Sequence, residues 1–571
     1  MSRRSTVTGM AIVAALALGA AACSSSSPSS NSSSGASGGS AKPLVIEDNP
    51  ISSFTNDFNP FDTKSSSSDE NTNALVYEPL LQYNTLNSAQ PPIPWLATKW
   101  AWSNGNKTLT LSLKQGVKWS DGQAFSSADV KFTMQLLAKN PGANRWGVPN
   151  VSSVSTPDAN TVVLNYSTPQ SAALANIGNT LIVPQHIWSS VTNPATAVIA
   201  TSKAIGTGPF LVDKFTPQNI TYKANNGYWG GAPKVKAVSL PAYANNDAAT
   251  LALSSGQIDL AGNNINNVEN TFVAKNPSTN HLFMEKPPYF PGTNTVVLLL
   301  NNKSTSAPAL ADAGVRKAIS AGVDRQALAT QCETNYELPA SSSGGLTLPM
   351  DKAFLDSKVS DDLKPTTDSA KVTSLMQGAG YTKTGGKWTK GGQTVKFTII
   401  DPNSFSDYWC GAQQIAKQLN AEGFDVTANG AYDPNTWSDA VTNGKYDASI
   451  HWGQGGTPFQ RLQFIADSAQ SAPVGQPAAG DLERYQSAAA DAAVKTYESA
   501  TTTDQAQAAL NKLQEQIAAD APSTPILYGA GWYEYSTANF TGWANESNPY
   551  VNPAPNDQNY EYLVLHLKPN S

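Results

Sequence analysis

Leu109, Leu111 and Leu113 alternate with polar residues near the start of the chain. Side chains two residues apart on an extended backbone point to one face, so this pattern predicts a half-buried strand. A Ser-Asp-Gly turn follows, and Ser126 with Asp129 then has the spacing of a capping box at a helix start. Apolar residues recur at helical spacing after Asp129, so a helix is predicted to follow the turn.

A second ordered pattern occupies residues 393–429. The segment GGQTVKFTIID predicts a strand, the next segment a helix with Ile415 and Leu419 on one stripe, and FDVTAN a second strand. Such a β-α-β succession predicts a parallel pair whose carboxyl ends open onto a crevice. The segment YDASIHW predicts a further strand that ends at Trp452, and ligands of open α/β sheets collect at such strand ends.

Strand-like and helix-like segments intermingle along the 571 residues, which favours an α/β class and two or three domains. The apolar run at residues 296–302 predicts a buried strand. Outside the N-terminal segment, no run approaches the eighteen apolar residues of a membrane-spanning helix. No internal repeat is evident.

The first residues predict export. Arg3 and Arg4 precede an apolar run at residues 10–22, which is the pattern of a signal peptide over residues 1–22. Small residues before Cys23 resemble the lipidation site of bacterial lipoproteins, although Ala20 stands where leucine is usual. With the Ser/Gly tether at residues 23–42, this predicts a protein anchored by a lipid on Cys23 at the extracytoplasmic face of the cell membrane. The alternative is an ordinary thiol just past a cleavage site.

The charged residues and the histidines limit the kinds of partner that the protein is expected to bind. Acidic residues outnumber basic ones by 43 to 37, and no Lys/Arg cluster marks a nucleic-acid surface. Four histidines stand at no ligand spacing, so neither a metal nor another cofactor is expected. Cys332 and Cys410 can form a disulfide outside the cytoplasm, which we favour, or remain two separate buried thiols. The protein is expected to be a monomer.

The sequence contains no recognisable catalytic motif. It has neither a G-x-S-x-G nucleophile elbow, nor an H-E-x-x-H zinc helix, nor a G-x-x-x-x-G-K-[ST] phosphate loop. A large exported chain without these motifs is predicted to bind a solute rather than to be an enzyme. An exported enzyme with an unrecognised site is the alternative.

Six motifs follow one another in a specific order. They include L-A-x-x-W, then G-V-x-W-x-D-G and A-D-V, then I-G-T-G-P-F, N-N-G-Y-W-G-G and S-G-Q-I-D-L. This ordered set resembles the extracytoplasmic solute-binding proteins of family 5, the oligopeptide-, dipeptide- and nickel-binding group of ABC importers. The matching blocks are residues 75–84, 94–133, 205–210, 225–231, 255–260 and 315–328.

The resemblance implies a two-lobed periplasmic-binding-protein fold of type II, cluster C-like, with an extra domain inserted in the first lobe. It also implies closure on a small solute by hinge bending and delivery to a membrane permease with its ATPase. We therefore expect lobe 1 at residues 43–78, 201–283 and 526–571, the extra domain at 79–200, and lobe 2 at 284–525.

The glycine-rich stretch at residues 446–459 is the expected solute site. In peptide binders of the family, an Asp three residues after the tryptophan holds the peptide α-amino group, and counting from Trp452 that position is Gly455. An ammonium without a carboxylate is costly to bury. The candidate site residues are His451, Trp452, Gly453, Gln454, Gly455 and Phe459, with Trp409, Trp437, Tyr289 and Phe290, and with Asn59 and Phe61 as a facing wall.

Two solutes stay open at this stage. An oligopeptide is the usual solute of the family and stands first. An oligosaccharide is favoured by the missing Asp and by aromatic rings beside neutral amides, since a ring supports a sugar's apolar face and amides meet its hydroxyl groups.

Overall fold

The computed structural model describes residues 42–570 except residues 49, 63 and 70. The predicted signal peptide, Cys23 and almost all of the tether lie outside the described residues. Lobe 1 is built on a seven-stranded sheet in the order β12-β22-β11-β1-β10-β9-β8. Its strands are β1 (Leu44–Glu47), β8 (Phe210–Thr216), β9 (Asn219–Ala224), β10 (Ala237–Pro241), β11 (Leu260–Ala261), β12 (Asn280–Leu282) and β22 (Glu534–Ser536).

The extra domain carries a four-stranded sheet in the order β4-β5-β7-β6. Its strands are β4 (Ala97–Ser103), β5 (Thr108–Leu113), β7 (Thr161–Asn165) and β6 (Ser153–Asp158). The three leucines of β5 are buried, and helix α3 (Ser127–Lys139) begins with the predicted capping box between Ser126 and Asp129. Both local predictions from the sequence are thus confirmed.

Lobe 2 is built on a six-stranded sheet in the order β14-β21-β13-β20-β18-β19. Its strands are β13 (Gly292–Leu300), β14 (Leu338–Pro339), β18 (Lys396–Ile400), β19 (Asp425–Asn429), β20 (Ala448–Trp452) and β21 (Ser523–Ala530). Strands β18 and β19 are parallel and joined by α11 (Ser406–Ala421), as predicted, and β20 is parallel to β18. Ile415 and Leu419 of α11 are buried in the core beneath this sheet.

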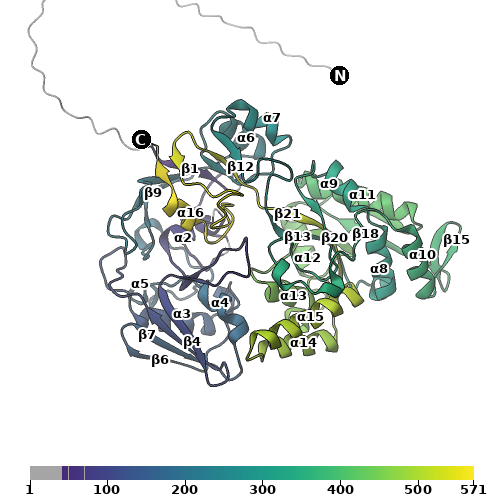
Figure 1. Cartoon of the computed structure of the whole chain (residues 1–571), viewed down its shortest axis with the longest axis horizontal. Helices are drawn as coiled ribbons and strands as arrows, with labels where there is room; N and C mark the ends of the chain where they lie inside the picture. The colour runs from purple at the N-terminus through teal and green to yellow at the C-terminus, as the bar shows by residue number, and fades with distance from the viewer. Residues whose placement is uncertain (1–41, 49, 63, 70, 571) are drawn as a thin grey trace, which may run out of the picture. The chain divides into compact units, whose positions relative to one another are not determined.

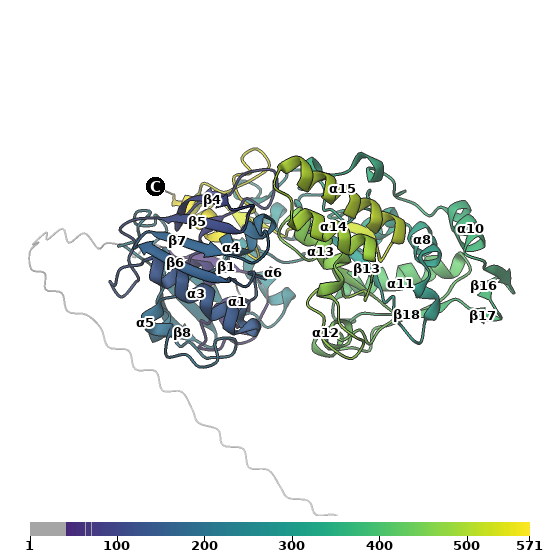
Figure 2. The same ribbon diagram turned by 90° about the horizontal axis from the view of Figure 1, so that it is seen from below.

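Helices pack beside β13. They are α13 (Pro458–Ala466), α14 (Ala488–Glu498) and α15 (Thr503–Asp520), whose apolar faces form a cluster of their own. Figure 2 shows the three helices gathered near β13. On α11, Cys410 is joined to Cys332, which follows α9 (Arg325–Gln331), by a disulfide with Cα atoms 5.6 Å apart. No helix among the described residues has the length and hydropathy that a membrane crossing requires.

The chain passes between the lobes after β12 and again after β21. Strand β21 pairs with β13 as far as Ala530, so it continues past the boundary at residue 525 that the sequence suggested. The chain then returns to lobe 1, where β22 lies between β12 and β11. In Figure 1 this C-terminal segment, drawn in yellow, shares lobe 1 with the purple β1. Lobe 1 is therefore assembled from both ends of the chain.

Candidate functional site

Strand β20 ends at the glycine-rich stretch and divides its last two side chains between core and surface. His451 is buried, as are the three residues before it, whereas Trp452 at the end of the strand is 44% exposed. Gly453 then donates its backbone N–H to the carbonyl of Thr295 on β13 at 2.7 Å. A Cβ at Gly453 would lie 2.9 Å from that carbonyl oxygen, so glycine is required for β13 and the loop to approach this closely.

Gly455 has a positive φ of 99°, a conformation that other residues rarely adopt. A Cβ on Gly455 would lie 2.7 Å from the backbone nitrogen of Arg461 and 2.8 Å from the carbonyl carbon of Gln460. With this backbone, position 455 has no room for any side chain, including the Asp of peptide binders. The absence of charge here is therefore a property of the loop geometry as well as of the residue.

The loop ends in the N-terminus of α13. Thr457 accepts a hydrogen bond from the backbone N–H of Gln460, and the Gln460 side-chain oxygen accepts from the N–H groups of Gly456 and Thr457 at 3.0 and 3.1 Å. Pro458 occupies the first helical position, where no N–H is needed. These caps fix the direction in which the loop leaves β20.

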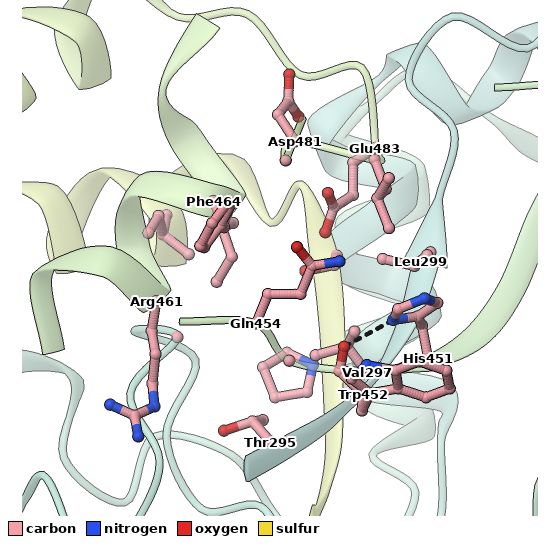
Figure 3. A pocket seen from close by; sticks show the side chains of 18 of the residues that line it. Thr295, Val297, Leu299, His451, Trp452, Gln454, Arg461, Phe464, Asp481 and Glu483 are labelled. Atoms are coloured by element: carbon pink, nitrogen blue, oxygen red, sulfur yellow. Dashed lines mark hydrogen bonds between the residues drawn. The ribbon is translucent and has the colours of Figure 1, made fainter. Parts of the chain in front are cut away.

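A narrow pocket of about 40 Å³, open to solvent on one side, lies between β13, β20 and α13 (Figure 3). Gln454 projects into this pocket from the loop, with Trp452 beside it. The lining side chains include Thr295, Val297 and Leu299 of β13, His451 and Trp452 of β20, Gln454 of the loop, Arg461, Phe464 and Ile465 of α13, and Asp481, Leu482 and Glu483. We call this space the strand-end pocket.

His451 is neutral in the strand-end pocket. Burial lowers its pKa to about 4. Its Nδ1 lies 2.7 Å from the carbonyl oxygen of Trp452, which can only accept, so Nδ1 carries the proton and Nε2 is an acceptor. Trp437 of α12 (Pro434–Thr442) stacks on the His451 ring at 5.5 Å and holds its orientation.

The opposite wall carries two carboxyl groups. Burial raises the pKa of Asp481 to about 9 and that of Glu483 to about 7. At neutral pH Asp481 is therefore mainly protonated and can donate a hydrogen bond. The wall thus presents polar groups with little net charge.

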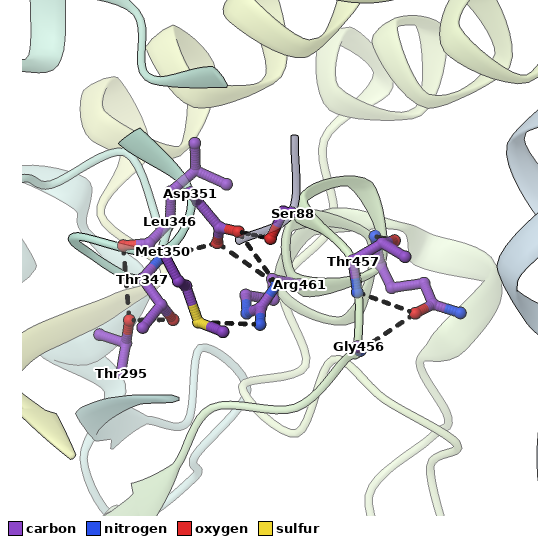
Figure 4. A network of polar contacts seen from close by, with 10 residues as sticks. Ser88, Thr295, Leu346, Thr347, Met350, Asp351, Gly456, Thr457 and Arg461 are labelled. Atoms are coloured by element: carbon purple, nitrogen blue, oxygen red, sulfur yellow. Dashed lines mark hydrogen bonds and ion pairs between the residues drawn. The ribbon is translucent and has the colours of Figure 1, made fainter. Parts of the chain in front are cut away.

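Arg461 is neutralised by a buried partner (Figure 4). Its Nη1 lies 3.3 Å from both carboxylate oxygens of Asp351, which is fully buried. Asp351 also accepts a hydrogen bond from Ser88 of the extra domain at 2.6 Å. A second contact joins α13 to the extra domain, because Gln460 donates to the side-chain oxygen of Asn176 at 2.8 Å. Arg461 therefore belongs both to the pocket wall and to a polar link between lobe 2 and the extra domain.

Four of the predicted site residues line this pocket: His451, Trp452, Gly453 and Gln454. Trp437 lies behind His451 and is buried. Phe459 points into the helical cluster, where it stacks on Tyr497 with ring centres 4.0 Å apart. Both rings position the site from behind rather than lining it.

The remaining candidates lie elsewhere. Trp409 packs against the lobe 2 core, whereas Tyr289 and Phe290 pack against Tyr336 near the crossing between the lobes. Asn59 is fully buried in lobe 1 and donates to the carbonyls of Pro194 and Ala197 at 2.9 and 2.7 Å.

Phe61 is buried beside Trp188, with ring centres 5.0 Å apart. Asn59 and Phe61 therefore stabilise the contact between lobe 1 and residues of the extra domain and do not form an accessible wall facing the pocket.

Sequence reasoning missed Arg461, Phe464, Asp481 and Glu483. Asp481 and Glu483 lie in an irregular segment between short helices, where no periodicity indicates burial. The only sequence feature at this place is the charged cluster DLER at residues 481–484. Such a cluster predicts a solvent-exposed turn, whereas the fold buries it.

Two lobes with separate sheets, two crossings between them and a pocket at a strand end define a two-lobed binding protein of the type II periplasmic class. The chain belongs to the bacterial extracellular solute-binding proteins, family 5, whose profile, described as the middle region, matches residues 91–472.

Named relatives are similar over different lengths. Protein XP55 of Streptomyces lividans is 25% identical, with 80% of this chain and 79% of the relative covered. The nickel-binding periplasmic protein of Escherichia coli K12 is 24% identical over 69% and 72% of the two chains. An ABC transporter peptide-binding protein of Brucella ovis is 32% identical, but the match spans only 32% of this chain and 35% of that protein.

Solved structures share the fold. The periplasmic oligopeptide-binding protein of Thermotoga maritima aligns with a TM-score of 0.82 and 24% identity, covering 93% of this chain and 99% of that one. A crystal structure of the same protein with mannohexaose bound aligns with a TM-score of 0.77 over the same shares of the two chains.

Proposed function

We propose that this protein is the solute receptor of an ABC importer and that its solute is an uncharged oligosaccharide bound at the strand-end pocket. The loop geometry at Gly455 carries this proposal, because the position that anchors a peptide ammonium in the family has neither a carboxylate nor room for one. Without a carboxylate at that position, a buried ammonium would have to pair with another acidic group or lose its hydration uncompensated.

The groups that remain in the pocket suit a sugar. The exposed indole of Trp452 offers a flat apolar face, while Gln454 and the neutral His451 offer a donor and acceptors for hydroxyl groups. The Thermotoga maritima structure with mannohexaose supports the proposal, since a protein of this fold that is named for oligopeptides also binds a saccharide.

Location and delivery form part of the same proposal. The receptor would be held at the extracytoplasmic face of the membrane by a lipid on Cys23 and would pass its solute to a permease with its ATPase.

An oligopeptide is the second candidate. Asp481 and Glu483 favour it, because their carboxyl groups line the strand-end pocket and one of them could ionise to pair with an ammonium group. The peptide-binding relative in Brucella ovis supports the same solute class.

A thermal-shift and calorimetric screen decides between the two. A solute that binds only the folded state raises the transition temperature, so mannose and glucose oligomers should stabilise the protein and tripeptides to pentapeptides should not. Stabilisation by the peptides alone would overturn the saccharide proposal in favour of the second candidate.

The variant Trp452→Ala tests the location of the site. Its affinity for the stabilising solute should fall at least about tenfold, which corresponds to about 1.4 kcal/mol, while the transition temperature without solute stays close to that of the wild type. Trp102→Ala is the matched control, because it removes an indole of the extra domain that lies outside the pocket. Unchanged affinity in Trp452→Ala would refute the assignment of the site.

A further inference from the structure

A second concave space is lined by the C-terminal residues of the glycine-rich loop. One wall comes from the extra domain and the other from lobe 2, so a molecule bound there would contact both. We call it the interdomain groove. Its lining residues are Tyr83, Asn84, Thr85, Asn87, Ser88, Gln90, Pro92, Ser171, Ala172, Leu174 and Ala175 on the first wall, and Phe354, Gly456, Thr457, Pro458 and Tyr497 on the second.

The groove and the strand-end pocket are neighbours along the chain. Gly453 and Gln454 line the pocket, while Gly456, Thr457 and Pro458 line the groove. Three peptide steps separate Gly453 from Gly456, so their Cα atoms are at most about 11 Å apart. An extended molecule that passed over the loop at Gly455 would contact both spaces.

The chemistry of the interdomain groove is uncharged. None of its lining residues is acidic or basic; they are amides, hydroxyl groups, aromatic rings and small apolar residues. The rings are Tyr83, Phe354 and Tyr497, and Tyr497 is held in place by its stack on Phe459. This combination offers flat apolar surfaces beside hydrogen-bonding groups, as the strand-end pocket does.

Two amides in the groove have donors to spare. Gln90 accepts from Asn84 through its oxygen at 3.1 Å, and Asn87 accepts from the backbone N–H of Ala89 at 3.1 Å. Within the described part of the chain, neither side-chain NH₂ group has a protein acceptor. Both residues are exposed, so these donors are available to a solute.

We propose that the interdomain groove is a second subsite for the same solute, and that the protein selects linear oligosaccharides long enough to fill both spaces. This rests on the proposed function, since it extends the saccharide from the strand-end pocket across the loop. The first units bind beside Trp452, and the later units lie between the extra domain and lobe 2, where they contact Gln90 and Tyr497.

A chain-length series tests this subsite. Isothermal titration calorimetry with linear mannose and glucose oligomers of one to six units should show affinity that rises with length in the wild type. Gln90→Ala and Tyr497→Leu should weaken binding of the six-unit oligomer at least about fivefold, or about 1 kcal/mol, and leave the two-unit oligomer unchanged. Trp452→Ala should weaken both lengths.

Two controls keep the result specific. Gln257→Ala is the matched control for Gln90→Ala, because Gln257 is an exposed glutamine of lobe 1 outside both spaces. Gln90 is itself an exposed residue, so its variant should keep the wild-type thermal transition even if Tyr497→Leu loosens the helical cluster.

The outcomes separate the two proposals. If saccharides bind but affinity does not depend on length, or if the groove variants weaken short and long oligomers equally, the second subsite is wrong while the saccharide function stands. If no oligomer binds the wild type, the saccharide function is overturned together with the subsite.

Discussion

Replacing Gly455 by alanine tests whether the loop geometry excludes a side chain. The substitution puts a Cβ into a backbone with φ of 99° and within 2.7 Å of the Arg461 nitrogen, which belongs to the first turn of α13. The loop must then change conformation, or α13 must move away from β20.

The expected cost follows from the two effects. Holding a residue with a Cβ in a sparsely populated backbone region costs about 1–3 kcal/mol, and the close contact adds to that cost. Replacing glycine also reduces the conformational entropy of the unfolded chain, but this stabilises the folded state by only about 0.4–1 kcal/mol. The free energy of unfolding of lobe 2 should therefore fall by about 1–3 kcal/mol.

Gly456→Ala is the matched control. Gly456 has no positive φ, and the nearest atom to its Cβ would be the Gln460 side-chain oxygen at 3.5 Å, an ordinary contact. Its variant should change the free energy of unfolding by less than about 1 kcal/mol. Urea titrations followed by tryptophan fluorescence compare the two midpoints, and equal midpoints would refute the steric argument at position 455.

Two further predictions concern the buried charges of the site. Arg461→Leu leaves the Asp351 carboxylate buried without a cation and should lower the free energy of unfolding by about 3–5 kcal/mol in urea titrations; the double variant with Asp351→Leu should recover part of this loss, and no recovery would contradict the pairing. Burial lowers the pKa of His451 to about 4, below its ordinary 6.5. Protons therefore bind preferentially to the unfolded chain, and the stability that the neutral His451 contributes is lost as the pH falls from about 6.5 to 4. The stability difference between the wild type and His451→Gln should change by about 3 kcal/mol over this range, and a pH-independent difference would refute the buried neutral imidazole.

The regular elements of the fold were predictable because their patterns are local. The leucines of β5, the capping box of α3 and the parallel unit around α11 each depend on residues close in sequence. Strand β20 and its exposed Trp452 were predictable for the same reason, and they supplied one side of the strand-end pocket.

The other side of the pocket depends on long-range packing. Asp481 and Glu483 line a pocket whose other walls come from distant elements, including β13, α13 and α15, and Arg461 is placed by an aspartate 110 residues earlier. Asn59 is the opposite case, because it was predicted for the site and long-range packing removes it from the site. Its amide suggested a binding wall, but its partner carbonyls lie 135 and 138 residues away, and those contacts bury it.

The position of β22 constrains the order in which the protein can fold. Strand β22 lies between β12 and β11, so the lobe 1 sheet cannot close until residues 534–536 have been delivered. All strands of the lobe 2 sheet lie within residues 292–530, so that sheet can form before residues 534–536 join lobe 1. During this interval β11 and β12 lack the strand that joins them. Residues 534–536 therefore complete the lobe 1 sheet, and a chain cut before them would expose unpaired strand edges in lobe 1.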